Sequence, residues 1–239
     1  MNRGFKRSDG NRQESYTSIQ DFENLTLKID LHVHTIYSAD SSITPKQLVY
    51  YAKKRGLDGV AVTDHDRLDG ALKISRETDF IILPGMEISS SVGHIVALDV
   101  QEKIPKGLTS EETVDRVHKA GGIAIACHPT TLFKGSLGKH ATSEFDAIEV
   151  INSSSLPFRY SEKRSGELAS RLGIPRVAGS DAHYAPEIGY AFTVVEAEPN
   201  IRGIIDAIKK GKCEPCGEAI PLPLRLRREF HKLLKLTLS

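Results

Sequence analysis

The stretch KIDLHVHT, residues 28–35, combines the pattern of a buried β-strand with three side chains that such a strand rarely buries. Side chains two positions apart in a strand project from the same face, so we expect Asp30, His32 and His34 to point toward one spot. An isolated pair of histidines at this spacing is equally compatible with one core and one surface residue. The rest of the sequence must decide whether a polar site lies at this strand.

Short β-branched runs recur along the chain: GVAVTD, FIILPGMEIS, HIVALDV, GIAIAC, AIEVIN, RVAGSD and AFTVVE. Helical patterns such as TPKQLVYYAKKRG and SEETVDRVHKAGG lie between several of them, and they open on Thr or Ser and close on Gly. This alternation predicts a mainly parallel sheet with crossover helices. Because no glycine-rich dinucleotide-binding fingerprint follows the first strand, a closed or distorted β/α barrel is favoured over an open doubly wound sheet.

The composition is that of an ordinary globular protein, and its 239 residues suffice for one large α/β domain. The net charge of +1 argues against a global field that attracts nucleic acid or membranes. No apolar run is long enough for a signal peptide or a membrane span, so we expect a cytoplasmic protein without a membrane partner. The C-x-x-C pair of Cys213 and Cys216 has no second pair to complete a zinc site, and we interpret it as an ordinary turn.

Polar residues also follow the later strands. His65, Glu87, His128 and His183 lie at or just beyond the ends of their apolar runs, where a β/α barrel carries its functional groups. His94 begins its run instead, but the short link after Glu87 predicts a hairpin that returns His94 to the same end. The full set contains six imidazoles and three carboxylates: His32, His34, Asp40, His65, Glu87, His94, His128, Asp181 and His183.

Such a set predicts a site for divalent metal ions. Packed together without metal, these groups would bury uncompensated charge, whereas divalent ions satisfy both imidazole and carboxylate ligands. The donors outnumber the ligands of one tetrahedral ion, and their mixture of nitrogen and oxygen suits Zn, Mn or Fe. Two ions about 3.5 to 4 Å apart lower the pKa of a bridging water and stabilise attacking and leaving oxygens, which points to hydrolysis. The G-x-S-x-G and P-loop motifs are absent from the sequence.

The ordered motifs DLHVHT, SAD, GVAVTDHD, PGMEIS, HIVAL, IACHP and AGSDAH resemble the PHP family, the polymerase and histidinol phosphatase superfamily, over residues 28–217. The resemblance implies a single-domain, TIM-like, distorted (β/α)7 barrel that hydrolyses phosphoesters with two or three metal ions and a metal-bridging hydroxide. It places the first ion at His32, His34, Glu87 and Asp181, the second at Glu87, His94 and His128, and the third at Asp40, His65 and His183. It also implies a catalytic set of Glu87, Asp181, His183, Asp30 and Asp64, in which Asp30 and Asp64, together with Asp66, would orient the ligating histidines.

The sequence departs from the family where the substrate phosphate would be held. Many members carry an arginine shortly after the histidine of the HP motif, whereas this chain reads HPTT. We expect the following loops to supply replacement groups, and the candidates for substrate binding are Lys134, His140, Asn152 and Arg159, with Lys139, Glu149 and Arg164 nearby. The expected substrate is a phosphorylated small molecule, a nucleotide or an oligonucleotide end.

The two ends of the chain differ from its centre. We expect residues 1–26 to form a flexible arm, residues 27–219 the PHP domain, and residues 220–239 a basic amphipathic helix. Leu226, Phe230, Leu233 and Leu234 would form the apolar side of that helix. It would dock on the barrel, with a surface for a partner, nucleic acid or an acidic membrane as the alternative.

Two other functions fit part of this pattern. Amidohydrolase-like C–N hydrolases also open with H-x-H, but they usually carry a bridging lysine where this chain offers Glu87. A non-catalytic metal-binding accessory module of nucleic-acid metabolism would show a degraded ligand set, whereas all nine positions are filled here.

Overall fold

The computed structural model describes residues 25–132 and 135–238. Of the predicted N-terminal arm, 1–26, all but the last two residues lie outside this part, and Thr26 already begins the first strand. No helix in the described ranges combines the length and the apolar character needed to cross a membrane.

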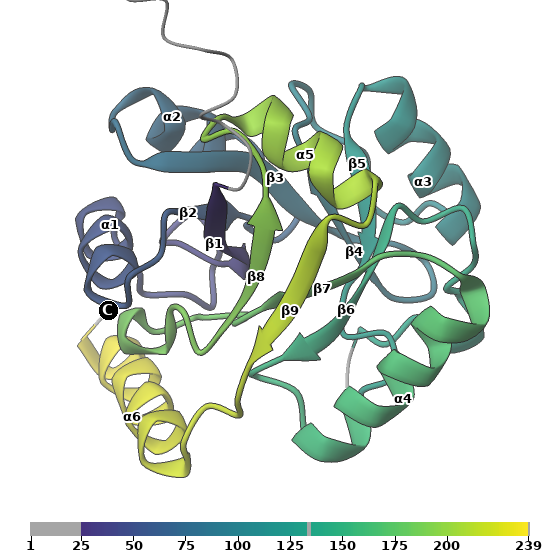
Figure 1. Cartoon of the computed structure of the whole chain (residues 1–239). Coiled ribbons are helices and arrows are strands. Elements are labelled where there is room, and N and C mark those ends of the chain that lie inside the picture. The colour runs from purple at the N-terminus through teal and green to yellow at the C-terminus, as the bar shows by residue number, and fades with distance from the viewer. Residues whose placement is uncertain (1–24, 133–134, 239) are drawn as a thin grey trace, which may run out of the picture.

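In the described part of the chain, nine strands form one continuous sheet at the centre of the molecule (Figure 1). The strands are β1 (Thr26–Val33), β2 (Gly59–Val62), β3 (Ile81–Ser89), β4 (His94–Leu98), β5 (Ile123–Ala126), β6 (Ala147–Asn152), β7 (Arg176–Gly179), β8 (Ala191–Glu196) and β9 (Cys213–Gly217). The α-helices are α1 (Pro45–Lys54), α2 (Asp69–Arg76), α3 (Ser110–Lys119), α4 (Phe158–Leu172), α5 (Ile201–Lys209) and α6 (Leu222–Leu238), with short 3-10 turns at Gly138–His140 and Ala185–Glu187. In the sheet, the strand order is β7-β6-β5-β4-β3-β2-β1-β8-β9.

The sheet curves into a nearly closed barrel. The segment that follows the end strand β7 meets β1, where the Asp181 amide donates to the His32 carbonyl at 2.8 Å and the His34 amide donates to the Ala182 carbonyl at 3.0 Å. This confirms the predicted α/β barrel. The expectation of a mainly parallel sheet was only partly right, since β3–β4, β4–β5, β1–β8 and β8–β9 are antiparallel within the described residues. The predicted hairpin is confirmed, with Ser89 paired to His94.

Local signals explain which helices could be predicted. Thr44 caps α1 and Thr109 caps α3, and each hydroxyl accepts the backbone N–H three residues later. The eight residues of α2 have no side-chain cap, because Leu68 occupies the N-cap position. The sequence pattern therefore missed α2.

The apolar core has two parts. Alternate residues such as Ile29, Leu83 and Val96 face one another inside the barrel, and Ile204 and Ile208 of α5 pack against them. The residues between them pack outward under the other helices, for example α1 and α3. Because α5 closes one end of the barrel with apolar side chains, polar groups collect at the opposite end, where the strands finish.

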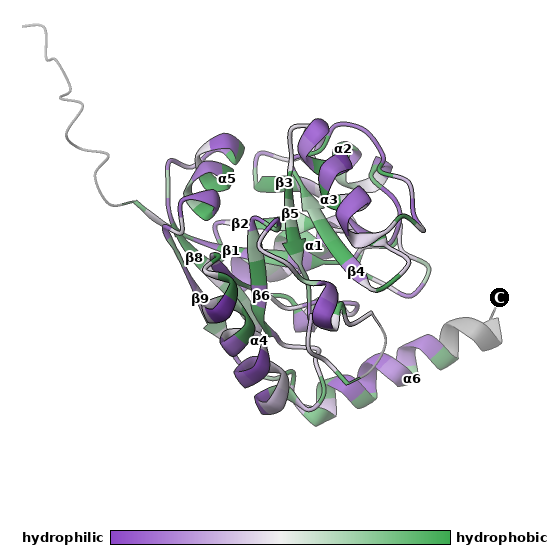
Figure 2. Ribbon diagram, turned by 90° about the vertical axis from the view of Figure 1, so that its right-hand side faces the viewer, coloured by the Kyte–Doolittle hydropathy of each residue, from purple (hydrophilic) through white to green (hydrophobic). Residues whose placement is uncertain are grey.

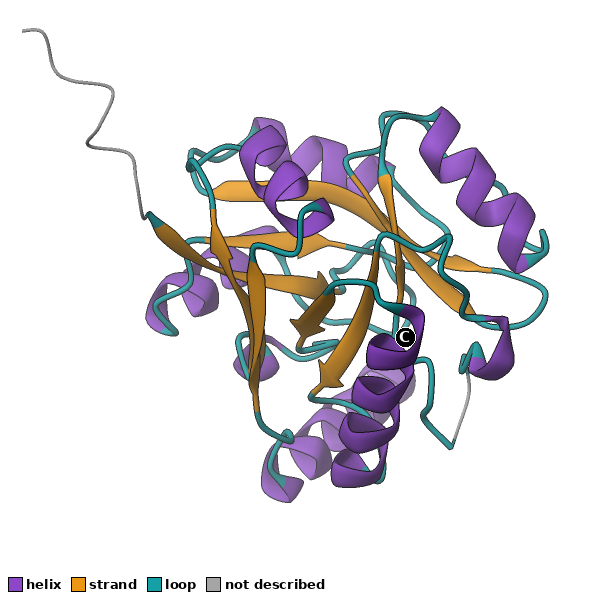
Figure 3. Ribbon diagram, turned by 45° about the vertical axis from the view of Figure 1, so that its right-hand side comes forward, coloured by secondary structure: helices purple, strands orange, loops and turns teal. Residues whose placement is uncertain are grey.

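Two predictions for the C-terminal region were wrong. The segment expected to be a turn at Cys213 and Cys216 is β9, an edge strand antiparallel to β8, and both thiols are free. A helix does form near the C-terminus, but its basic side faces the barrel: Arg225 is 9% exposed, whereas Leu226 and Phe230 are 62% and 61% exposed. Figure 2 shows α6 running along one edge of the molecule, and Figure 3 shows the helix from another side. The Leu234 side chain lies outside the described part.

Candidate metal centre

The nine predicted ligands converge at the open end of the barrel around Glu87, which is 1% exposed on β3. The first group lies deepest. Oε2 of Glu87 is 3.2 Å from Nε2 of His34 and 3.4 Å from Nε2 of His32. Oδ1 of Asp181 lies 3.3 Å and 3.7 Å from the same two nitrogens. These four side chains form the cluster predicted for the first ion.

The other two groups lie on either side of it. Oε1 of Glu87 is 2.8 Å from Nδ1 of His94 and 2.9 Å from Nε2 of His128. Oδ2 of Asp40 is 3.0 Å from Nε2 of His183 and 3.5 Å from Nε2 of His65. Nδ1 of His65 also reaches Oε2 of Glu87 at 3.0 Å. Glu87 therefore touches donors of all three predicted groups, as a bridging carboxylate must.

Unsatisfied buried atoms test whether these residues fit metal ions. Nε2 of His32, Nε2 of His34 and Oε2 of Glu87 are buried, and no hydrogen-bond partner for them exists among the described residues. Buried polar atoms are normally paired, so three unpaired atoms aimed at one space require a partner of another kind. A divalent ion with mixed nitrogen and oxygen ligands satisfies all three. The residues present fit such an ion.

Backbone irregularities aim several of these ligands. A register shift in β1 between Asp30 and Val33 is a bulge that reverses the alternation of faces. His32 and His34 therefore share the barrel interior with Ile29, while Asp30 does not. Elsewhere, His128 and Asp181 adopt φ values of +31° and +54°, which are uncommon for residues with a side chain and are typical of functional sites.

Glu149 on β6 fixes the orientation of His32. Its Oε1 is 3.0 Å from Nδ1 of His32, while its Oε2 accepts hydrogen bonds from the His128 amide at 2.8 Å and from Nδ2 of Asn152 at 2.9 Å. A carboxylate that accepts the Nδ1 proton leaves Nε2 unprotonated and free to bind metal. The pair fits tightly against Gly179, where an added Cβ would lie 2.4 Å from Cβ of His32. Glu149 was expected near the pocket, but its contact with His32 was not predicted.

The charges in the centre stabilise one another. Burial opposes ionisation of Glu87, but the imidazoles of His32, His128 and His34 outweigh it and hold the Glu87 pKa well below its usual range. Burial likewise disfavours the charged form of His65, yet its contacts with Asp40 and Glu87 raise the His65 pKa to about 9. Metal ligands bind in their deprotonated form, so metal binding at His65 would release the proton that this raised pKa favours.

Asp30 and Asp64 contact the backbone around the ligands, and Asp30 accepts a hydrogen bond from the His32 amide at 3.3 Å. Asp30 accepts hydrogen bonds from the backbone amides of Ser180 at 2.8 Å and Gly189 at 2.9 Å, and burial raises its pKa to about 6 despite these bonds. Asp64 accepts from the amide and hydroxyl of Thr35 at 2.6 and 2.7 Å. Asp66 similarly binds the amide and hydroxyl of Ser89. These contacts fasten the loops that carry the ligands, and none of them reaches an imidazole ring.

A pocket of about 380 Å³ opens over the centre. Of the predicted substrate-binding residues, Asn152 lines it, and its amide also donates to Asp181 at 3.3 Å. Arg159 and His140 do not line it: Arg159 is 87% exposed and pairs with Glu162, and His140 binds the Ser110 hydroxyl through its carbonyl. Lys134 lies outside the described residues.

Two arginines of α6 line the pocket and were missed. Arg225 and Arg228 reach it from the C-terminal helix, far from the motifs in sequence. Arg225 donates to the carbonyls of Ser153, Ser154 and Ile220 at 2.6 to 2.9 Å. The sequence feature that could have identified them is the spacing of the two arginines, three residues apart, on the side of the helix opposite Leu226 and Phe230.

Comparisons with known proteins identify the family of the chain. A PHP domain model matches residues 30–81 and a PHP-associated model matches residues 160–213. An uncharacterized protein of Methanocaldococcus jannaschii is 36% identical over 140 residues, which cover 53% of this chain and 82% of that protein. A probable phosphatase of Caldicellulosiruptor bescii is 26% identical over 199 residues, covering 68% of this chain and 82% of the relative.

The fold also matches a solved structure. The crystal structure of a Bacteroides vulgatus two-domain protein, described as containing a predicted PHP-like metal-dependent phosphoesterase, superposes with a TM-score of 0.67 at 20% identity. The match covers 88% of this chain and 71% of that one. With the motif-bearing strands, the clustered ligands and these relatives together, the chain belongs to the PHP family.

Proposed function

We propose that the protein hydrolyses a phosphoester of a small molecule, a nucleotide or an oligonucleotide end, using two or three ions of Mn, Zn or Fe. The observation that carries this proposal is the contact of Glu87 with five imidazoles, together with the unpaired buried atoms of His32 and His34. The nine predicted ligands would hold the ions, with Glu87 shared between them.

When bound, divalent ions would polarise the phosphate oxygens and lower the pKa of water. The protein's own residues perform the remaining tasks. Glu149 keeps Nε2 of His32 directed at the centre, and Asn152 bonds both Glu149 and Asp181. The pocket of about 380 Å³ lies within the range of small-molecule sites, so it accommodates a compact phosphorylated group.

Two features favour this reaction over the alternatives. Among the described residues that line the pocket there is no lysine, the bridging group expected in a C–N hydrolase of the amidohydrolase type. The donor set is also complete, which argues against a non-catalytic accessory module.

The test is a panel of phosphate esters, from a chromogenic monoester to nucleoside monophosphates and short oligonucleotides, assayed after loading with Mn, Zn or Fe. We expect phosphate release that a chelator abolishes. In Glu87→Gln, we expect the rate to fall at least about a hundredfold, with a matched loss of bound metal. Glu77→Gln, at an exposed glutamate, is the control. Unchanged activity and metal content in both Glu87→Gln and His128→Ala would refute the proposal.

A further inference from the structure

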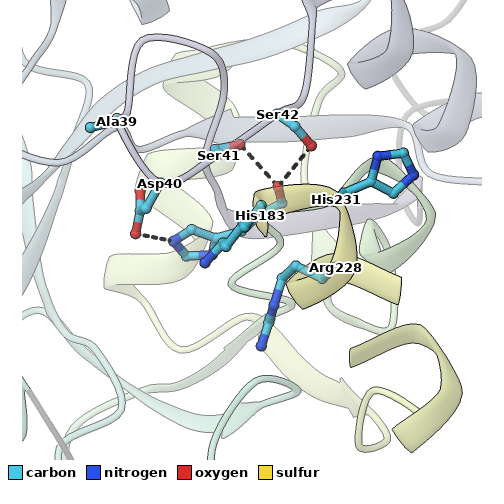
Figure 4. Close-up of a pocket in the computed structure, with 8 residues that line it drawn as sticks. Ala39, Asp40, Ser41, Ser42, His183, Arg228 and His231 are labelled. Atoms are coloured by element: carbon cyan, nitrogen blue, oxygen red, sulfur yellow. Dashed lines mark hydrogen bonds and ion pairs between the residues drawn. The ribbon is translucent and has the colours of Figure 1, made fainter. Parts of the chain in front are cut away.

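A second, smaller pocket adjoins the metal centre. It encloses about 190 Å³ and shares Asp40, His183 and Arg228 with the larger pocket (Figure 4). Ala39, Ser41, Ser42, His231 and Lys232 complete its lining. The shared side chains place the second pocket directly beside the metal centre.

Helix α6 forms the basic wall of this pocket. Arg228, His231 and Lys232 are spaced three and four residues apart, which places them on one side of the helix. Arg225 lies one turn before Arg228 and binds three backbone carbonyls, so it holds this side of α6 against the loop after β6. Arg228 and Lys232 are therefore presented by an anchored element.

Part of the charge on this wall is already paired. Nη1 of Arg228 lies 3.3 Å from the buried Glu187, and its Nε lies 3.0 Å from Glu229. The ring of His231 packs on Tyr184 with centroids 5.0 Å apart. Within the described part of the chain, no acceptor is bonded to Nη2 of Arg228 or Nζ of Lys232. These two donors are free to bind an anion.

The carboxylate in the pocket does not cancel this preference. Asp40 is directed toward Nε2 of His183 at 3.0 Å and Nε2 of His65 at 3.5 Å. The hydroxyls of Ser41 and Ser42 donate to the His183 carbonyl, as Figure 4 shows, and thereby fix the loop opposite α6. The negative charge thus faces the metal centre, and the positive charge comes from α6.

We propose that this pocket is a second phosphate subsite, which binds a phosphate group that the substrate carries beyond the one being hydrolysed. The inference rests on the proposed phosphoesterase function and narrows its substrate class to molecules with two phosphate groups. Arg228 and Lys232 are the specificity-determining residues. They supply, from α6, positive charge that the sequence HPTT does not provide next to His128.

The kinetic test compares alkanediol bisphosphates of increasing length with the corresponding monophosphates. We expect kcat/KM to be higher for a bisphosphate of optimal length and this preference to fall about fivefold in Lys232→Ala, since an ion pair with a partly exposed lysine is of modest strength. Lys232→Arg should retain the preference, and so should the control Lys210→Ala at an exposed lysine beyond α5. Methylating the second phosphate distinguishes a subsite for a terminal phosphate, where the preference is lost, from one that also accepts a diester.

A binding measurement separates this inference from the proposed activity. Propane-1,3-bisphosphonate and propylphosphonate, which are not hydrolysed, are titrated calorimetrically into the full chain with and without Mn. Tighter binding of the bisphosphonate that weakens in Lys232→Ala supports the subsite even if no ester is hydrolysed. Equal binding of both ligands, or a preference that Lys232→Ala leaves intact, would overturn the subsite without affecting the proposed reaction.

Discussion

The substitution Glu149→Gln changes one buried oxygen and one charge, and it tests how the metal centre is oriented. Glu149 accepts three hydrogen bonds, from Nδ1 of His32, the His128 amide and Nδ2 of Asn152. A glutamine has only one oxygen to place. If that oxygen faces His32, the amide NH₂ opposes two other donors. If it faces His128, the NH₂ points at Nδ1 of His32 and favours the tautomer with the proton on Nε2, the atom needed for metal.

The expected loss of metal affinity follows from the hydrogen bond to Glu149 that the substitution removes. A hydrogen bond to a charged group contributes about 1.5 to 3 kcal/mol, and Glu149 is only 3% exposed, so solvent does not replace it. We therefore expect metal affinity to fall about 10- to 100-fold, the range typical of residues that orient metal-binding histidines.

Competition with a chromogenic chelator measures this affinity, and circular dichroism verifies that the variant remains folded. Glu144→Gln, at an exposed glutamate in the loop before β6, is the matched control and should bind metal as the unchanged protein does. Wild-type affinity in a folded Glu149→Gln would show that the His32 orientation does not depend on this carboxylate.

Three further predictions concern stability and reactivity. Mn or Zn at about 100 times its Kd should stabilise the folded protein by about 2.7 kcal/mol, which is measured as a rise in Tm that a chelator reverses. An unchanged Tm would contradict metal binding to the native state. Gly179→Ala should destabilise the protein by about 1 to 3 kcal/mol and weaken metal binding, because the new Cβ would lie 2.4 Å from Cβ of His32. Gly166→Ala on α4 places its Cβ in open space and is the control. A denaturant titration should show no loss of stability in this control. Burial raises the Cys213 pKa to about 11, so alkylation of this thiol at pH 9 should be at least about tenfold slower than that of a free thiol. The rate should increase as the pH rises toward 11. Mass spectrometry measures both rates, and equal rates would refute the burial of Cys213 on β9.

The placement of the ligands was largely predictable, because it depends on topology more than on detail. Successive strands of a β/α barrel finish at one end, so residues such as His65, His128 and His183 that follow apolar runs must gather there. The hairpin that returns His94 to this end could be inferred from the short link after Glu87. The order of these residues along the chain was therefore sufficient to predict that they lie together.

The orientation of individual side chains was less predictable. Strict alternation places Asp30 with His32, but the bulge in β1 separates them, and no residue type in KIDLHVHT marks it. β9 was missed because CEPCG contains no β-branched residue, and it is a strand because it pairs with β8. In both cases, tertiary contacts decide the backbone, and a single segment of sequence does not contain them.

For helix α6, the amphipathic pattern correctly predicted a helix but led to the wrong prediction of which side of the helix packs on the barrel. Its leucines predict an apolar side that docks on the protein, yet the docked residues are Arg225 and Arg228. The surface beside α6 explains the reversal. It offers the carbonyls of Ser153 and Ser154 and the buried carboxylate of Glu187, which a leucine would leave unsatisfied. The polarity of the receiving surface therefore selects the face of an amphipathic helix, and beside a polar active centre it selects the charged one.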